Sequence, residues 1–99
     1  MSKIYKILTH TEWEAANKLG HVKTELDDRD GFIHCSTAKQ LALTLHFYFS
    51  KEESLVLCEI EERNLNRSEY LFEKAVSENR SEQDFPHIYG KLGIEQISK

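Results

Sequence analysis

The sequence predicts one α+β domain over residues 1–99, with small antiparallel sheets and two main helices. A chain of 99 residues is long enough to bury one modest core. Strand-like apolar runs alternate with just two helical patterns, too few to cover both faces of a doubly wound sheet. Hydrophobic residues make up 39% and charged residues 30%, which is typical of globular domains. We therefore expect antiparallel pairing of the strands.

The chain begins with a predicted strand and helix. Residues 4–8 alternate apolar and polar side chains closely enough to favour a strand. A helix follows over about residues 11–19, with Thr9 or Thr11 as its cap. Glu14 stands three residues after Thr11, the spacing of a capping box. The glycine after this segment is a natural helix stop.

The next part of the chain predicts a turn, a strand and a second helix. Acidic residues before a glycine indicate a turn over residues 27–31, and residues 32–35 form a short apolar strand. Thr37 and Gln40 have capping-box spacing and begin a helix over about residues 37–49. Its apolar stripe is wide, so we expect this helix to be largely buried.

Residues 55–60 form the clearest strand, a near-continuous apolar run expected in the middle of a sheet. Residues 70–73 predict a short strand, residues 77–84 an exposed polar loop, and residues 94–97 an edge strand. The predicted core includes Ile7, Trp13, Phe32, Leu41, Leu45, Leu57 and Ile60.

Charge and apolar patterning exclude several classes of function. The net charge of −4 and the scattered arginines argue against binding to a nucleic-acid backbone, although one local pocket can still accept a small or nucleotide-like ligand. No signal-type or membrane-spanning apolar run is present, so we expect a cytoplasmic protein. Cys35 and Cys58 lie in apolar runs without metal-binding spacing and are expected to be buried thiols.

His34 and Ser36 stand between a strand and a helix start, where backbone N–H groups attract anions. Equally, His34 is compatible with a core histidine and Ser36 with a helix cap. Covalent catalysis is disfavoured, because Cys35 points to the opposite strand face from His34 and Ser36 lacks the Gly-x-Ser-x-Gly turn.

A second candidate segment crowds Phe85, His87 and Tyr89 into a short turn beside the only proline. Rigid aromatic walls suit a flat ring, and a structural plug is an equal alternative. Glu73 faces either a cleft or a surface ion pair. Together, His34, His87 and Glu73 resemble the ligands of a catalytic zinc, but their spacing lacks an HxxxH or HxH pair, so we expect no metal.

These motifs resemble a family of uncharacterised bacterial proteins, domain of unknown function 952. The similar segments are residues 4–7, 12–13, 31–37 with Gln40, 71–73 and 85–90. The resemblance implies a fold similar to the ADP-ribosyltransferase superfamily, with strongly curved antiparallel sheets around an NAD cleft. It also implies that the His34-Cys35-Ser36 segment lies in that cleft and that Glu73 takes the place of the catalytic Glu.

The resulting hypothesis is an ADP-ribosyltransferase-like enzyme that binds NAD or a related nucleotide and acts at a ribose. Glu73 and His34 would be catalytic, and Ser36 would hold ribose or phosphate. Tyr5, Lys6, His87 and Tyr89 would line the cleft, with Lys6 as a point charge for phosphate. The alternatives are a non-catalytic module for a small ligand and a partner-interaction domain with the same fold.

Overall fold

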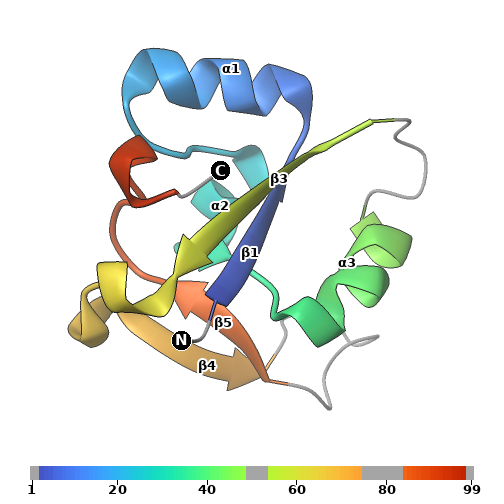
Figure 1. Ribbon diagram of the computed structural model, residues 1–99, viewed down its shortest axis with the longest axis vertical. Helices are drawn as coiled ribbons and strands as arrows, with labels where there is room; N and C mark the ends of the chain where they lie inside the picture. The colour runs from blue at the N-terminus through green and yellow to red at the C-terminus, as the bar shows by residue number, and fades with distance from the viewer. Residues whose placement is uncertain (1–2, 49–53, 75–83, 98–99) are drawn as a thin grey trace.

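Two small antiparallel sheets form the framework of the protein, as Figure 1 shows. The structure is a computed structural model that describes residues 3–48, 54–74 and 84–97. Strand β1 (Lys3–Leu8) pairs with β3 (Val56–Glu61) in one sheet. The other sheet has the order β2-β5-β4. The predicted α+β class with antiparallel pairing is confirmed.

Strand β3 was predicted to lie in the middle of a sheet. It lies instead in a two-stranded sheet with β1 as its partner, so this prediction is wrong. Alternation along the strand turns Cys58 and Ile60 into the core, where both are fully buried. Leu57 points to the opposite face and is 49% exposed, so its prediction as a core residue is wrong.

Helix α1 (His10–Leu19) begins one residue earlier than predicted and lies across one end of the β1–β3 pair (Figure 1). Its capping box uses Thr9 and Glu12 instead of Thr11 and Glu14. The Thr9 hydroxyl accepts from the Glu12 N–H at 3.1 Å, and the Glu12 carboxylate accepts from the Thr9 N–H at 2.9 Å.

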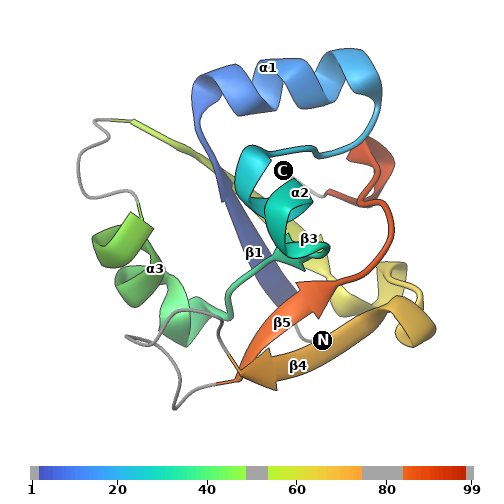
Figure 2. The ribbon, with the colours of Figure 1, turned by 180° about the vertical axis from the view of Figure 1, so that it is seen from behind.

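A short helix, α2 (Glu25–Asp30), replaces the turn predicted over residues 27–31 and is clearest in Figure 2. The Thr24 hydroxyl caps it by accepting from the Asp27 N–H at 3.1 Å. Acidic residues in the first turn stabilise the helix, because their negative charges lie at the positive end of the helix dipole. Gly31 ends the helix with φ +84°, so the glycine signal marked a helix end and not a free turn.

A 3₁₀ turn and helix α3 (Leu41–Tyr48) account for the second predicted helix. The Gln40 side chain accepts from the Thr37 N–H at 3.0 Å, in agreement with the predicted cap. Its amide also donates to the Asp84 carbonyl at 2.7 Å, which ties the helix start to β5. Leu45 is 40% exposed, and none of the described side chains of α3 is fully buried, so the predictions of a buried Leu45 and a largely buried helix are wrong. Residue 49 lies outside the described residues.

Strand β5 (Asp84–Ile88) runs between β2 (Ile33–His34) and β4 (Tyr70–Lys74), where the sequence predicted an aromatic turn. Pro86 is tolerated inside this central strand because its backbone faces the segment just beyond β2. The Cys35 N–H donates to the Pro86 carbonyl at 3.0 Å, and no return bond is required.

The two remaining sequence predictions concern the chain after β4. The loop predicted over residues 77–84 falls outside the described residues except for Asp84, which begins β5. The edge strand predicted over residues 94–97 is wrong, because Ile94–Gln96 forms a 3₁₀ turn and Ile97 makes an isolated bridge to Ile60.

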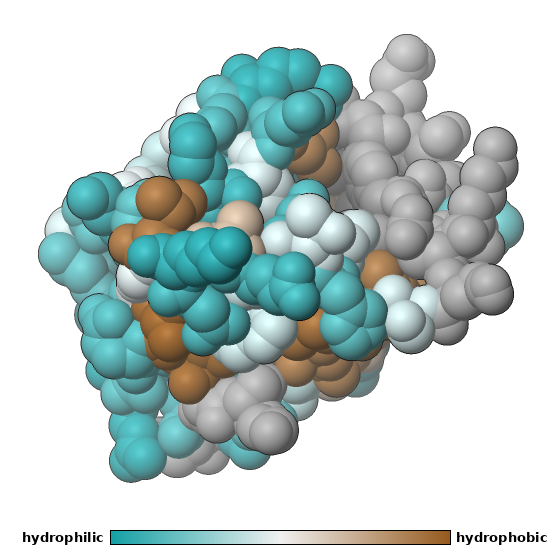
Figure 3. Space-filling view, turned by 90° about the horizontal axis from the view of Figure 1, so that it is seen from above, coloured by the Kyte–Doolittle hydropathy of each residue, from teal (hydrophilic) through white to brown (hydrophobic). Residues whose placement is uncertain are grey.

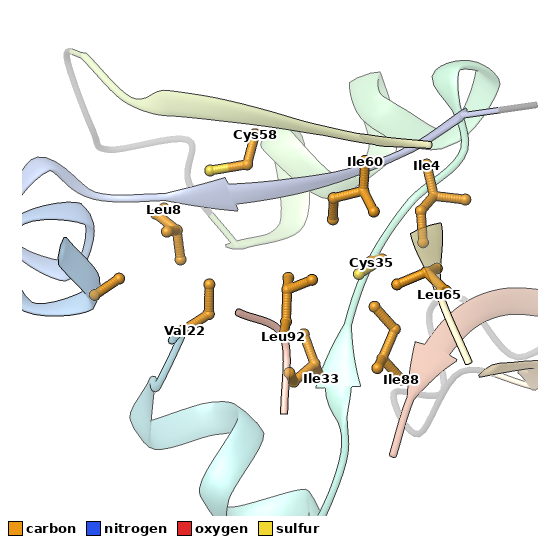
Figure 4. Close-up of a cluster of buried hydrophobic side chains, with 11 residues drawn as sticks. Ile4, Leu8, Val22, Ile33, Cys35, Cys58, Ile60, Leu65, Ile88 and Leu92 are labelled. Carbon is orange, nitrogen blue, oxygen red and sulfur yellow. The ribbon is translucent and has the colours of Figure 1, made fainter. Parts of the chain in front are cut away.

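The core lies between the two sheets and beneath α1, and Figure 4 shows side chains from both sheets meeting there. Ile4, Leu8, Ile60 and Leu92 are fully buried, and Trp13 packs partly buried against them. The thiols of Cys35 and Cys58 are buried and unpaired, as expected. Phe32 and Leu41 are only partly buried.

The face over α1 is mostly hydrophilic, with separate hydrophobic patches between the polar residues (Figure 3). Among the described residues, none of the helices combines the length and the apolar character that crossing a membrane requires.

Candidate functional site

Two histidines face each other across the second sheet. His34 on β2 pairs in register with His87 on β5, and their ring centroids lie 5.8 Å apart. Phe32 completes the group by stacking on His87 at a centroid distance of 4.0 Å and tilting against His34 at 4.5 Å. The antiparallel register therefore brings the two predicted histidines together, although they are more than fifty residues apart in the sequence.

Two carboxylates of α2 hold the ring of His34. Its Nδ1 lies 2.6 Å from Asp27 Oδ1, and its Nε2 lies 2.8 Å from Asp30 Oδ2. Ionised carboxylates only accept hydrogen bonds, so a ring N–H directed at either acid donates to it. The two contacts fix the orientation of the ring, whose side chain is 24% exposed.

Lys6 anchors this arrangement from strand β1. Its ammonium nitrogen lies 2.8 Å from Asp27 Oδ2, and it donates to Asp27 Oδ1 at 3.0 Å and to the His34 carbonyl at 2.9 Å. Both charged side chains are almost completely buried. Burial raises the pKa of the Asp27 carboxyl, but the hydrogen bond from His34 and the charge of Lys6 together outweigh it, so the net pKa is lowered. The buried carboxylate therefore stays ionised.

Glu73 lies on β4 beside His87 and Tyr89. One carboxylate oxygen, Oε1, lies 2.9 Å from His87 Nδ1 and accepts from the Tyr89 hydroxyl at 2.6 Å. The Tyr89 hydroxyl is the main reason that the pKa of Glu73 is lowered, and His87 adds to the effect. The same bond raises the pKa of Tyr89. Because the Glu73 side chain remains 37% exposed, it is an oriented anion open to solvent.

His34, His87, Glu73 and Tyr89 thus gather around the ring of Phe32, whose centroid lies 5.4 Å from that of Tyr89. We call these five residues the aromatic–carboxylate site. Chemically, the site offers a flat apolar wall, one imidazole of fixed orientation and one carboxylate suited to a group that gains positive charge.

The other three predicted site residues lie elsewhere. Lys6 is buried in its ion pair with Asp27. Ser36 is also buried, and its hydroxyl lies 2.6 Å from the Thr44 hydroxyl on α3. Tyr5 exchanges backbone hydrogen bonds with Ser36 at 2.7 and 2.8 Å, and strand alternation places its side chain opposite that of Lys6. These contacts join β1 to the segment before α3.

Sequence reasoning did not identify Phe32 as a site residue, nor Asp27 and Asp30 as partners of His34. The acids were assigned to a turn, whereas α2 places Asp27 and Asp30 one helical turn apart. Asp30 stands four residues before His34, and this short separation was the available signal that the two side chains are partners. Among the described residues, no cluster of three or more His, Cys, Asp or Glu side chains is arranged to hold a metal ion.

Comparison with known proteins gives one family and one set of solved structures. The family model described as "Protein of unknown function (DUF952)" matches residues 7–99. The crystal structure of protein CC0527 from Caulobacter crescentus is similar, with a TM-score of 0.86 and 31% identity over 99% of this chain and 82% of that chain. The solution structure of CC0527 gives a TM-score of 0.78 at 31% identity, covering 100% of this chain and 82% of that chain. No curated protein matches the sequence.

Proposed function

Because the chain belongs to the DUF952 family of proteins of unknown function, we propose its activity from the site itself. In this proposal it is a cytoplasmic protein with an ADP-ribosyltransferase-like fold that binds NAD or a related nucleotide and acts at a ribose. The single observation that carries the proposal is Glu73, an exposed carboxylate held ionised by Tyr89 and His87 beside a stacked aromatic wall.

Glu73 supplies the chemistry in this proposal. When the bond between a ribose and its base breaks, the sugar becomes positively charged, and a fixed anion stabilises that state more than the ground state. The lowered pKa of Glu73 keeps its carboxylate charged at neutral pH. The Tyr89 and His87 hydrogen bonds hold one oxygen in place, so the carboxylate needs little rearrangement during the reaction.

The aromatic residues supply binding. The Phe32 ring lies nearly parallel to that of His87, with 26° between their planes, and Tyr89 tilts beside it. A planar base stacks on such a wall through apolar contact and its ring electrons. His34 adds an imidazole ring that Asp27 and Asp30 hold in a fixed orientation.

The buried residues have positioning roles in this proposal. Lys6 holds Asp27 and the backbone of β2, and so fixes His34 without touching phosphate. Ser36 and Tyr5 fix the start of α3 against β1. Two small sheets without a strand ladder between them are in line with the split sheets of an ADP-ribosyltransferase-like fold.

The experiment combines calorimetric titration with NAD and an assay for released nicotinamide. We expect Glu73→Gln to abolish turnover and leave NAD binding largely intact, because the amide keeps the shape but loses the charge. His34→Ala should weaken binding. Glu59→Gln, on the distant strand β3, and His10→Ala, at the exposed start of α1, are matched controls. The absence of both binding and turnover with every dinucleotide tested would refute the proposal.

A non-catalytic binding module is the second candidate. It is favoured because the polar groups of the site already have hydrogen-bond partners: both nitrogens of His34 and one oxygen of Glu73. Binding of a nucleotide without turnover in the unmutated protein would support it. The half-exposed Leu71 and Phe72 on β4 favour a partner-interaction domain if no small ligand binds.

A further inference from the structure

A hollow of about 260 Å³ adjoins the aromatic–carboxylate site. It lies between the residues that follow α1, the end of α2 and the segment after β5. Its lining includes Lys23, Asp27, Gly31, Phe32, Gly90 and Lys91. Pockets for drug-sized ligands are usually about 300–1,000 Å³. This hollow therefore suits a fragment, such as one half of a dinucleotide.

The hollow and the site share a wall. Phe32 stacks on His87 on the side of the site and also lines the hollow. Gly90, which directly follows Tyr89, lines it as well. A larger hollow of about 690 Å³ between α1 and α2 contains no residue of the site. Only the smaller of these two hollows can therefore extend a ligand that begins at Glu73.

Charge in the hollow favours an anion. Asp27 is paired with Lys6, and Asp28 is paired with Lys23. Lys91 makes no ion pair within the part of the chain that the structure describes. An unmatched ammonium group binds phosphate as a point charge. Lys91 is therefore the lysine of the lining that no described carboxylate pairs.

The backbone at the end of α2 also suits a ligand. Asp27 Oδ2 is buried against the Lys6 ammonium group, 2.8 Å away, so this carboxylate oxygen is closed to a ligand. A side chain added at Gly31 would meet no atom within 4 Å. The backbone beside Gly31 is therefore open to close approach by a ligand.

We propose that this hollow binds the phosphate-bearing half of a nucleoside diphosphate, with Lys91 as the cation that meets the phosphate. The inference rests on the proposed function, because it extends the same ligand from the aromatic–carboxylate site. It gives the dinucleotide two adjoining subsites, one at Glu73 and one at Lys91, with Phe32 between them.

The test titrates the full chain with ADP, pyrophosphate and adenosine, and follows backbone amides by NMR. We expect ADP and pyrophosphate to shift the amides of Gly31 and Gly90. Lys91→Ala should raise the Kd for ADP about tenfold, the loss of one charge-assisted phosphate contact. The Kd for adenosine should be unchanged, because it has no phosphate. Lys18→Ala, an exposed lysine at the end of α1, is the matched control.

The outcomes separate this inference from the proposed function. Two results would overturn the proposed phosphate site in the hollow even if NAD is bound and cleaved. One is amide shifts confined to the Glu73 side, and the other is equal ADP affinity in Lys91→Ala and Lys18→Ala. ADP binding that depends on Lys91, in a protein that neither binds nor cleaves NAD, supports the hollow and refutes the proposed function. An unchanged melting temperature shows that Lys91→Ala is folded.

Discussion

Replacing Lys6 with methionine tests the buried charge network that holds β1, α2 and β2 together. Methionine keeps most of the side-chain length and removes only the ammonium group. The change deletes the ion pair to Asp27 and the hydrogen bond to the His34 carbonyl. It leaves Asp27 buried at 5% exposure with His34 as its main remaining partner.

The expected loss is large because an uncompensated charge stays in the interior. Breaking a buried ion pair by removing one partner costs about 3–5 kcal/mol. A domain of 99 residues loses roughly 4–8 °C of melting temperature for each kcal/mol. Lys6→Met should therefore melt at least about 12 °C below the unmutated protein.

Lys3→Met is the matched control on the same strand. Lys3 lies 2.8 Å from Glu59, the same separation as in the buried pair, but the two side chains are 42% and 33% exposed. An exposed pair contributes about 0–1 kcal/mol. Urea unfolding followed by circular dichroism measures both variants. Equal losses below about 1 kcal/mol in Lys6→Met and Lys3→Met would refute the view that Asp27 is a buried charge.

Acid unfolding gives the same prediction a second readout. The folded pKa of Asp27 lies below its ordinary value of 3.8, so its contribution to stability is full above that value. That contribution is lost as the pH falls through the lower, folded pKa. Without Lys6 the folded pKa rises, so Lys6→Met should unfold at a higher pH during an acid titration. An unchanged acid midpoint would contradict this.

Three further predictions concern packing, backbone and thiols. Ile60→Ala should cost about 2–5 kcal/mol in urea unfolding, whereas the half-exposed Leu57→Ala should cost under about 1 kcal/mol. Similar losses would show that the assignment of strand faces is wrong. Gly90→Ala and Gly31→Ala should both lower the melting temperature, because both glycines have a positive φ, +101° and +84°, that side chains rarely adopt. An unchanged melting temperature in both variants would contradict this backbone conformation. Burial raises the pKa of Cys35 to about 12, so iodoacetamide at pH 8 should alkylate it only after unfolding, as mass spectrometry would show. Rapid alkylation of the native protein would exclude a buried thiol.

The sequence was most informative where the local pattern was strong. The period of the apolar residues and the Thr37–Gln40 cap identified the strands and the start of the second helix. Leu57 shows the limit of the method. A near-continuous apolar run is typical of a central strand, but only the sheet order determines whether both of its faces are covered.

The candidate site could be predicted in part because its residues lie on strands with clear patterns. His34, His87 and Glu73 were identified, and their meeting depended on the pairing of β2 with β5 and β5 with β4. Lys6 could not be assigned correctly, because its partner Asp27 belongs to a helix that the turn-like sequence concealed. The structural role of a lysine is decided by a contact 21 residues away.

That long separation has a consequence for the order of folding. The Lys6 contacts span 21 residues to Asp27 and 28 residues to His34, with all of α1 in between. The network can close only after β1 and β2 have come together, whereas the turns of α1 need only neighbouring residues. We therefore expect these contacts to form late, after the folding transition state. Weakening them should speed unfolding while the folding rate changes little, so the lifetime of the native protein depends on one buried ion pair.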